Sequence, residues 1–410
     1  MQTPMRIALV AEGSRGDVHP MLELAARLHA AGHQVQLFAA PDFSADAAAR
    51  EIPFVAVGGS LREQLLDLAG AVTSGTLRVL ADATRYLARS VEAQFACLPD
   101  ATAGSELIVG ASLAFAAPSC AELHRVPYRF VAYCPALFPS SDHPSILVPT
   151  QSLPRWLNRL SWRLSVPLLD AYLRRLVNGR RGRLGLPPVE NAWRHLMTER
   201  PILASDRALA PAPADAPLAV RQLPCLHSMR VDPLPAKLES FLEQGPTPIY
   251  VGFGSMPDPD PAATTGLVLE AAASVGARLV IGAGWAGLGE AALPEGAIAV
   301  GSVSHPSLFA RVAAVVHHGG AGTTTTAARA GAPQVVVPHF ADQHYWARRV
   351  QLLGLGPAPI RRSRLTGARL AEALDAVIGN ELLADRAAAL GERLRADATA
   401  IDPIEFLLSD

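Results

Sequence analysis

His317-His318-Gly319-Gly320-Ala321-Gly322-Thr323-Thr324 forms the most informative turn in the chain. It follows an apolar run, 313–316, that predicts a buried strand, and it leads into a helix predicted to begin at Thr323. A glycine-rich turn between a strand and a helix leaves backbone N–H groups unpaired at the positive end of the helix dipole, which favours phosphate. Many such turns serve only close packing, so this turn alone does not assign a ligand.

A second polar motif follows the next apolar run, 334–337, where that predicted strand ends. It reads Pro338-His339-Phe340-Ala341-Asp342-Gln343-His344-Tyr345-Trp346. Carboxylate and amide groups form hydrogen bonds with hydroxyls, so Asp342 and Gln343 are candidate ligands for a sugar. Phosphate and sugar together suggest that this half of the chain binds a nucleotide sugar.

Composition excludes several classes of protein. The chain has 410 residues, which favours two domains, and a net charge of −1, which does not indicate nucleic acid or an anionic membrane as partner. Its four cysteines lie far apart, which predicts buried thiols in a reducing compartment and no disulfide framework or zinc site. No signal-peptide pattern and no apolar run of about 18 residues is present, so we expect a cytoplasmic protein without a transmembrane segment.

Short apolar runs alternate with helical stretches in both halves of the chain, which predicts βαβ units and parallel sheets. One amphipathic helix is predicted over 20–31, with Gly32 as its stop. Two α/β domains that face each other bring the carboxyl ends of both sets of strands to one cleft. The predicted strands are 6–11, 34–40, 53–57, 107–111 and 128–134 in the first half, and 249–255, 278–284, 298–303, 313–318 and 334–338 in the second.

We therefore expect an acceptor-binding domain over 1–210 and a nucleotide-sugar-binding domain over 248–390. The proline-rich segment 211–247 is the predicted linker between them. The segment 391–410 is predicted as a C-terminal helix that packs back on the first domain. The proline-punctuated segment 135–154 is either a loop over the cleft or a plain connector, and the sequence leaves both open.

The first predicted strand runs into the turn Glu12-Gly13-Ser14-Arg15-Gly16-Asp17-Val18-His19-Pro20. Asp17 stands just before a predicted helix, where a carboxylate either caps the helix or serves as a general base. Ser14, Arg15 and Gly16 of the same turn are candidate contacts to the nucleotide sugar. The dinucleotide fingerprint GxGxxG is absent, which argues against a nicotinamide enzyme.

Further candidates follow the strands of the second half. Ser255 offers a hydroxyl to phosphate or forms a simple turn. Trp285 either lines the nucleotide pocket or belongs to the core. Ser302 and Val303 offer backbone groups to a base edge. All five predicted strand ends of this half bear glycine, hydroxyl or polar groups, which is hard to explain by structure alone.

No metal site is predicted, because His317 and His318 are adjacent and their side chains diverge, and no tetrahedral set of ligands can be assembled. The helical region 156–183 contains seven arginines. Such a region is either a solvated helix face or a peripheral contact with a membrane surface.

These motifs together resemble the bacterial nucleotide-sugar glycosyltransferases that include the vancomycin-group enzymes, with macrolide, rhamnolipid, sterol and plant enzymes as related branches. The resemblance covers nearly the whole chain and is strongest over 13–25, 249–255, 301–309 and 315–350. It implies an α/β fold of the GT-B type, in which two Rossmann-like domains with parallel sheets face an interdomain cleft. It also implies that no catalytic metal is used.

The resemblance implies a role for each matching residue. His318 matches the histidine that contacts the α-phosphate, and Asp342 with Gln343 matches the pair that holds sugar hydroxyls. Asp17 stands where plant members have a catalytic histidine and the antibiotic branch has an aspartate. The diphosphate cradle matches Gly320, Ala321, Gly322 and Thr323, and the base-contacting segment begins at Ser302 and Val303.

The chain departs from the plant pattern at two places. Plant members have an aspartate behind their histidine, where this chain reads Val109-Gly110-Ala111-Ser112. They also have a glutamate for the ribose hydroxyls, where this chain has Thr326. Without that glutamate, discrimination between ribose and deoxyribose should weaken, so both UDP and dTDP sugars remain open.

The sequence thus predicts a hexosyltransferase that moves a hexose or deoxyhexose, with inversion, from a UDP or dTDP sugar to a hydroxyl of a lipophilic natural product. No cofactor is expected, nor nucleic acid as a partner, and the protein is expected to be a monomer or weak dimer. One alternative is a sugar-nucleotide 2-epimerase, although Thr325-Thr326-Ala327-Ala328 lacks the paired glutamates of those enzymes. The other is a non-catalytic partner protein. The sugar, the acceptor and the linkage stay open.

Overall fold

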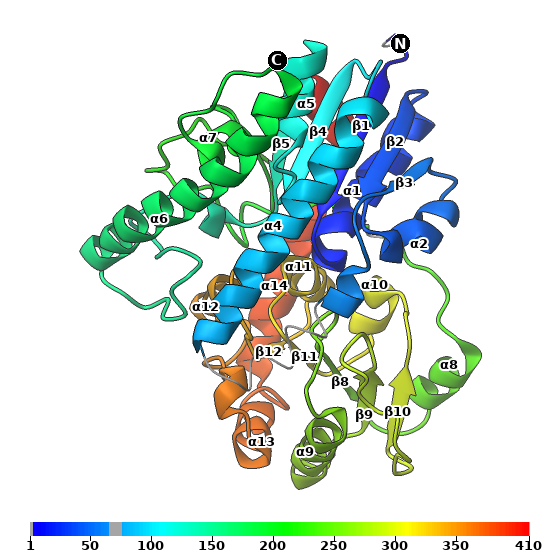
Figure 1. Cartoon of the computed structure of the whole chain (residues 1–410). Coiled ribbons are helices and arrows are strands. Elements are labelled where there is room, and N and C mark those ends of the chain that lie inside the picture. The colour runs from blue at the N-terminus through cyan, green and yellow to red at the C-terminus, as the bar shows by residue number, and fades with distance from the viewer. Residues whose placement is uncertain (1–2, 65–75, 229, 410) are drawn as a thin grey trace.

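The computed structural model describes residues 3–64, 76–228 and 230–409 and contains two parallel sheets, one above the other in Figure 1. The order is β3-β2-β1-β4-β5-β6-β7 in the first sheet and β10-β9-β8-β11-β12 in the second. The domain around the first sheet is called the N-terminal domain here, and the domain around the second the C-terminal domain. The predicted α/β fold with two parallel sheets is confirmed.

The N-terminal domain is built from short strands with helices between them. Its strands are β1 Arg6–Glu12, β2 Gln34–Ala39, β3 Phe54–Ala56, β4 Leu107–Ser112, β5 Tyr128–Ala132, β6 Ile202–Ala204 and β7 Arg221–Leu223. Its helices are α1 Arg15–Ala30, α2 Ser44–Ala48, α4 Thr76–Ala101, α5 Ala117–His124, α6 Arg155–Arg181 and α7 Ala192–Met197, with 3-10 turns at Pro41–Phe43, Pro135–Leu137 and Gly182–Leu184.

The C-terminal domain repeats this alternation on a smaller sheet. Its strands are β8 Ile249–Gly252, β9 Leu279–Gly282, β10 Ala297–Val300, β11 Val315–His317 and β12 Gln334–Val336. The helices are α8 Ala236–Glu243, α9 Pro261–Ser274, α10 His305–Phe309, α11 Ala321–Ala330, α12 Gln343–Leu352, α13 Gly367–Asp375, α14 Glu381–Asp397 and α15 Pro403–Leu408, with a 3-10 turn at Arg362–Arg364.

Each sheet is buried on both faces, which explains why the strands read as continuous apolar runs instead of alternating ones. In β1 every residue after Arg6 is buried, and in β8 all of them are. One apolar cluster of the N-terminal domain continues into the C-terminal domain through α12 and α14. The two domains therefore share part of their core.

The strand order changes direction at two points, and these points position the candidate site. β1 lies between β2 and β4, and β8 lies between β9 and β11. In an open parallel sheet, the crevice at such a switch point, outside the carboxyl ends of the strands, is the usual place for a ligand. The start of α1, which follows β1 and contains Asp17, and the turn after β11, which contains His318, lie at these two crevices.

The end of the chain returns to the N-terminal domain, where α15 packs on α1. Arg221, in β7, donates from Nη2 to the carbonyl oxygen of Phe406 at 3.0 Å and lies over its ring at 4.3 Å. Figure 1 shows α14 running from beside the second sheet towards the first. The predicted domain boundaries stay a prediction, and the segment 211–247 is more structured than a plain linker, because β7 and α8 lie in it.

The predicted start of the first helix was wrong. Helix α1 begins at Arg15, five residues before the predicted start at 20, and Pro20 lies inside it. A capping box sets the true start, since Ser14 is the N-cap residue and Asp17 is the third helical residue. The prediction gave Pro20 the first helical position, where proline is common, although here it lies in the second turn.

Candidate active site

A central cavity of about 540 Å³ lies between the two domains, and both switch points open into it. Every predicted site residue except Trp285 lines this central cavity. The N-terminal domain contributes the turn after β1, and the C-terminal domain contributes the ends of β8, β10, β11 and β12. The cavity is therefore the place where the separate sequence motifs meet.

Asp17 is held in one position by its neighbours in the N-terminal wall. Its Oδ2 accepts hydrogen bonds from the backbone N–H of Ser14 at 2.7 Å and from the Ser14 hydroxyl at 3.2 Å. Its Oδ1 accepts one from the hydroxyl of Ser112 at 2.5 Å. Burial raises the pKa of Asp17, and the hydrogen bonds from Ser112 and Ser14 oppose that rise. Asp17 therefore caps α1, and the same hydrogen bonds hold its carboxylate in a fixed orientation facing the cavity.

Ser112, whose hydroxyl donates to Asp17, has a strained backbone conformation. It has a φ of +56°, in the left-handed region that residues other than glycine rarely adopt. Strain of this kind persists where the surrounding structure enforces it, and it clusters at functional sites. Ser112 lies in the segment where the resemblance would put an aspartate, so a hydroxyl aimed at Asp17 takes that place.

A second carboxyl group stands beside Asp17. Glu12, at the end of β1, accepts a hydrogen bond from the hydroxyl of Tyr86 at 2.7 Å, and both residues line the cavity. Burial raises the pKa of Glu12, and the charge of Asp17 adds to that rise. The N-terminal wall thus holds two acidic groups with raised pKa values close together.

On the opposite wall, the two adjacent histidines do different work. His317 is fully buried and structural: its Nε2 pairs with Oε1 of Gln334 at 2.9 Å, and its Nδ1 accepts from the N–H of Gly319 at 3.0 Å. His318 lines the cavity, and its Nδ1 has no hydrogen-bond partner among the described residues. Burial lowers the pKa of His318 to about 3. It is therefore a neutral imidazole with one nitrogen available to a ligand.

The turn after His318 requires glycine. Gly319 has a φ of +89°, and a Cβ atom there would lie 2.9 Å from the carbonyl oxygen of Gln343. Gly320 is the N-cap residue of α11, which is ten residues long. The free N–H groups of its first turn and the positive end of its dipole therefore face the cavity beside His318.

Another imidazole lies over this turn. His227 lines the cavity, and its Nε2 is so near that a Cβ atom on Gly322 would lie 2.0 Å from it. Its Nδ1 is 3.2 Å from the sulfur of Cys225. Burial lowers the pKa of His227 to about 4. Two neutral imidazoles, His227 and His318, therefore stand beside the start of α11.

Asp342 and Gln343 follow β12, but they are engaged differently. Asp342 accepts from Nε1 of Trp346 at 3.2 Å, and burial raises its pKa to about 7, with the charge of Asp17 as the next cause. Gln343 accepts from the N–H of His339 at 2.8 Å, and its amide nitrogen is 3.3 Å from the sulfur of Met256. Asp342 can therefore meet a ligand directly, whereas Gln343 mainly shapes its loop.

The remaining predicted residues divide into two groups. Ser255, Ser302 and Val303 line the cavity, as does Thr326. Trp285 does not; its ring lies 6.4 Å from that of Phe43, in the N-terminal domain, and the Arg15 guanidinium lies 6.0 Å from it. The Trp285 side chain is thus part of the domain interface. It lies beside the cavity lining through Arg15, and its backbone N–H donates to the carbonyl oxygen of Gly254, another lining residue, at 2.9 Å.

A buried ion pair joins the two halves behind the site. Arg329 of α11 donates from Nε and Nη2 to the carboxylate of Asp206 at 2.7 and 2.6 Å, and both side chains are at most 1% exposed. Arg329 also donates to the carbonyl oxygen of Cys225 at 3.1 Å. Because breaking such a pair leaves a buried charge without a partner, it holds α11 firmly against the N-terminal domain.

In the described part of the chain, no group of three or more His, Cys, Asp or Glu side chains is placed to hold a metal ion. No helix there is long and apolar enough to cross a bilayer.

Two family models match the chain, one in each domain. Residues 7–129 match the glycosyltransferase family 28 N-terminal domain, and residues 266–405 match the C-terminal domain of the erythromycin biosynthesis protein CIII-like family. The vancomycin aglycone glucosyltransferase of Amycolatopsis orientalis is 37% identical over 410 residues, which cover 97% of this chain and 96% of that one. This chain belongs to the antibiotic-type glycosyltransferases.

Two further comparisons agree with this assignment. The dTDP-epi-vancosaminyltransferase of the same organism is 36% identical over 365 residues, which cover 86% of this chain and 85% of that one. The crystal structure of the kitacinnamycin glycosyltransferase superposes with a TM-score of 0.71 at 22% identity and covers 100% of both chains. The predicted GT-B fold and the predicted hexosyltransferase class are thereby confirmed.

Sequence reasoning missed several groups in the glycosyltransferase site. Glu12 and Ser112 end neighbouring strands at a switch point, so the sequence pattern indicates both as candidates. No such pattern marks Tyr86 and His227, because one comes from a long helix and the other from the proline-rich segment. Their places in the site depend on how distant segments pack.

Proposed function

We propose that this glycosyltransferase moves a hexose or deoxyhexose from a UDP or dTDP sugar to a hydroxyl of a lipophilic natural product, with inversion at the anomeric carbon. One observation carries the proposal: a preorganised carboxylate, Asp17, and a glycine-rich helix start with a free imidazole, His318, line one cavity from opposite domains. The names of two relatives, one a glucosyltransferase acting on an aglycone and one a dTDP-sugar transferase, support this substrate class.

In the proposed reaction the acceptor oxygen attacks the anomeric carbon of the sugar. A bond forms between that oxygen and the carbon, and the bond from the carbon to the diphosphate oxygen breaks. The hydroxyl proton passes to the carboxylate of Asp17, whose raised pKa makes it a better base than a solvated aspartate. A single displacement of this kind inverts the anomeric centre.

The departing diphosphate gains negative charge as the bond breaks. Neutral His318 and His227 can each donate one N–H to it, and the first turn of α11 adds backbone N–H groups. Preorganised donors of this kind stabilise a transition state without reorganising, which makes them effective in a site shielded from water. Asp342 is suited to accept hydrogen bonds from the hydroxyls of the sugar.

The test is transfer by the purified chain. We expect it to release nucleoside diphosphate from UDP-glucose or a dTDP-hexose when phenolic and polyketide aglycones are supplied. The proton coupling of the anomeric hydrogen in the product, measured by NMR, should show inverted configuration. Retained configuration, or no release with any donor in the panel, would refute the proposal.

A further inference from the structure

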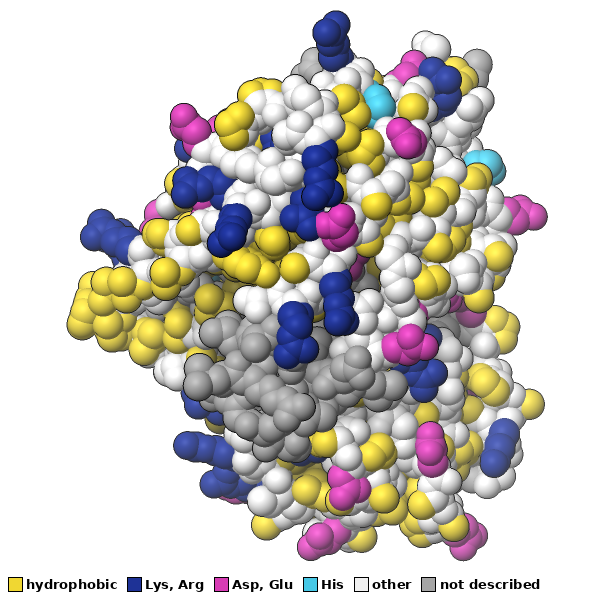
Figure 2. All heavy atoms as spheres, viewed as in Figure 1, with side chains coloured by type: hydrophobic (Ala, Val, Ile, Leu, Met, Phe, Trp, Pro, Cys, Tyr) yellow, Lys and Arg dark blue, Asp and Glu magenta, His cyan; other side chains and the backbone are white. Residues whose placement is uncertain are grey.

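Helix α6 carries an unusual concentration of exposed apolar side chains. The group is called the apolar stripe here and consists of Leu147 (63% exposed), Trp156 (65%), Leu160 (41%), Leu164 (62%) and Leu168 (76%). Figure 2 shows hydrophobic side chains gathered at the left edge of the molecule, where Figure 1 has α6. Exposed apolar residues that occur singly need no explanation, but a contiguous patch marks an interaction surface.

The spacing explains why these residues share one face. The four helical members are four residues apart, so they lie along one side of the helix. The opposite side of α6 is buried, through Trp162, Leu173 and Val177. Leu147 joins the stripe from the preceding loop, because it lines the same small pocket as Val166 and Leu169 of α6.

The charge of α6 is the second observation. The helix contains seven arginines and one aspartate, while the whole chain has a net charge of −1. Arg155 and Arg159, beside Trp156, are 70% and 62% exposed, and each pairs with a carboxylate, Arg155 with Asp142 at 3.2 Å and Arg159 with Asp215 at 3.9 Å. Arg163, one turn further, is exposed and has no acidic partner among the described residues. Within the part of the chain that the structure describes, the unpaired positive charge beside the apolar side chains therefore comes from Arg163, with Arg155 and Arg159 exposed next to it.

We propose that the apolar stripe binds the surface of an anionic lipid bilayer, with α6 lying in the plane of the interface. Leucines at the level of the acyl chains and arginines at the level of the phosphates are what an interfacial helix requires. Trp156 adds an aromatic ring of the kind enriched at that depth, and the long arginine stems allow the charged groups to reach the headgroups. The complementary charge favours anionic lipid over a second copy of this chain, which would bring the same arginines.

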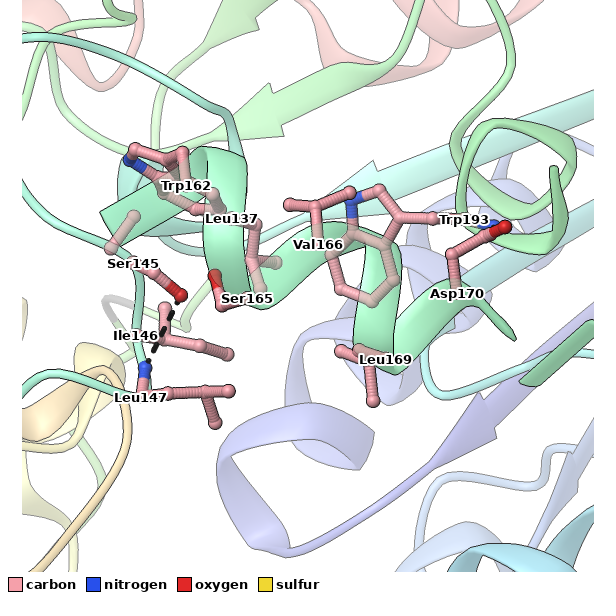
Figure 3. Close-up of a pocket in the computed structure, with 11 residues that line it drawn as sticks. Leu137, Ser145, Ile146, Leu147, Trp162, Ser165, Val166, Leu169, Asp170 and Trp193 are labelled. Atoms are coloured by element: carbon pink, nitrogen blue, oxygen red, sulfur yellow. Dashed lines mark hydrogen bonds between the residues drawn. The ribbon is translucent and has the colours of Figure 1, made fainter. Parts of the chain in front are cut away.

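Figure 3 shows a small pocket beside α6, and Leu147 of the apolar stripe is one of its lining residues. Its volume is about 20 Å³, and three of its lining residues, Leu137, Ile146 and Trp193, also line the central cavity. Ser165 Oγ and Trp193 Nε1 belong to this lining and have no hydrogen-bond partner in the described parts of the chain. If the proposed function holds, this apolar wall leads an acceptor dissolved in the bilayer towards Asp17.

The test is flotation with vesicles of phosphatidylglycerol and phosphatidylcholine, compared with vesicles of phosphatidylcholine alone. The wild-type chain should float with the anionic vesicles, and less with the neutral ones. The double variant Leu164→Glu/Leu168→Glu should bind at least about tenfold more weakly, because it loses buried apolar area and repels the phosphates. Arg163→Gln should weaken binding to anionic vesicles by about fivefold and leave neutral vesicles unaffected.

The matched control is Leu382→Glu, which changes an equally exposed leucine (62%) on α14, away from the stripe. It should bind vesicles as the wild type does. Failure of the wild type to bind anionic vesicles, or equal losses in both leucine variants, would overturn the proposal. Self-association that disappears in Leu164→Glu/Leu168→Glu, without vesicle binding, would also overturn it and assign the stripe to a second copy. Vesicle binding is measured without donor or acceptor, so its result is independent of the proposed transfer reaction.

Discussion

On the N-terminal wall of the central cavity the Asp17 carboxylate accepts hydrogen bonds from Ser14 and Ser112, whereas on the C-terminal wall Nδ1 of His318 has no partner within the described residues. The first wall holds a base that is already oriented. The second wall holds donors whose partners a ligand must supply. Because an unpaired buried polar group is costly, ligand binding should stabilise the C-terminal wall more than the N-terminal one.

The largest expected effect comes from removing the base. Asp17→Asn keeps the shape and most hydrogen bonds of the side chain but cannot accept the acceptor's proton. We expect kcat to fall by roughly 10² to 10⁴, while the affinity for the nucleotide sugar, measured by titration calorimetry, stays within about twofold. Near-normal turnover of this variant would reduce Asp17 to a capping residue.

The corresponding change on the opposite wall should affect binding. His318→Ala removes the imidazole beside the diphosphate cradle, and we expect the affinity for nucleoside diphosphate to fall about ten- to a hundredfold, since a hydrogen bond to a charged group contributes about 1.5–3 kcal/mol. The control is His317→Gln, because both ring nitrogens of His317 are hydrogen-bonded within the protein. That variant should lower the melting temperature and change affinity little. Equal effects of both variants on affinity would contradict the division of labour between these histidines.

The role of His227 can be tested through Gly322. In Gly322→Ala the new methyl group would displace the His227 ring. We expect donor KM to rise by about tenfold or less, because one donor to the diphosphate is moved rather than removed. If displacement is the cause, the double variant Gly322→Ala/His227→Ala should match His227→Ala alone in a double-mutant cycle. An additive loss would show that Gly322 acts through the backbone instead.

Substitutions of Ser112 test how its hydrogen bond sets the pKa of the base, Asp17. This hydrogen bond lowers the pKa of Asp17, so in Ser112→Ala that pKa should rise further. Asp17 then stays protonated up to a higher pH, so the acidic limb of the kcat–pH profile should shift to higher pH. At neutral pH, kcat should fall a few-fold. Ser112→Gly should shift the acidic limb by the same amount. It should also be more stable than Ser112→Ala, because glycine accepts the φ of +56°. An unchanged limb in both variants would mean that another group titrates.

The sequence predicted the strands and the two polar turns well, because buried parallel strands and glycine-rich turns have strong local patterns. It predicted the start of α1 poorly, because Ser14 and Asp17 cap the helix before the more visible Pro20. Trp285 stands near a strand end as predicted, yet its ring packs on Phe43 of the other domain. The residues next to Trp285 in the sequence do not indicate that its ring contacts the other domain.

The sequence pattern is least informative for His227 and Tyr86, which contact the groups of the site. His227 reaches α11 because the segment after β7 crosses the domain interface, where the Arg329–Asp206 pair fixes it. The contact of Tyr86 with Glu12 joins a helix to a strand 74 residues away. Such contacts follow from packing of the whole chain, and no pattern of neighbouring residues contains them.

The smallest expected effect concerns Asp342, whose pKa burial raises to about 7. In the unfolded chain this carboxyl ionises near its ordinary value of 3.8, so between 3.8 and about 7 the folded protein binds a proton that the unfolded chain has lost. The stability contributed by that proton is therefore full at low pH and disappears as the pH rises towards 7.

Asp342→Asn removes this dependence while its amide oxygen can still accept from Trp346. The variant should melt about 2–4 °C above the wild type at pH 8, and the gap should narrow at pH 5. Asp17 and Glu12 titrate in both proteins, so the difference between their melting curves reports Asp342 together with its coupling to Asp17. A gap that stays constant with pH would mean that Asp342 is ionised throughout, and the C-terminal wall would then hold a permanent charge opposite Asp17.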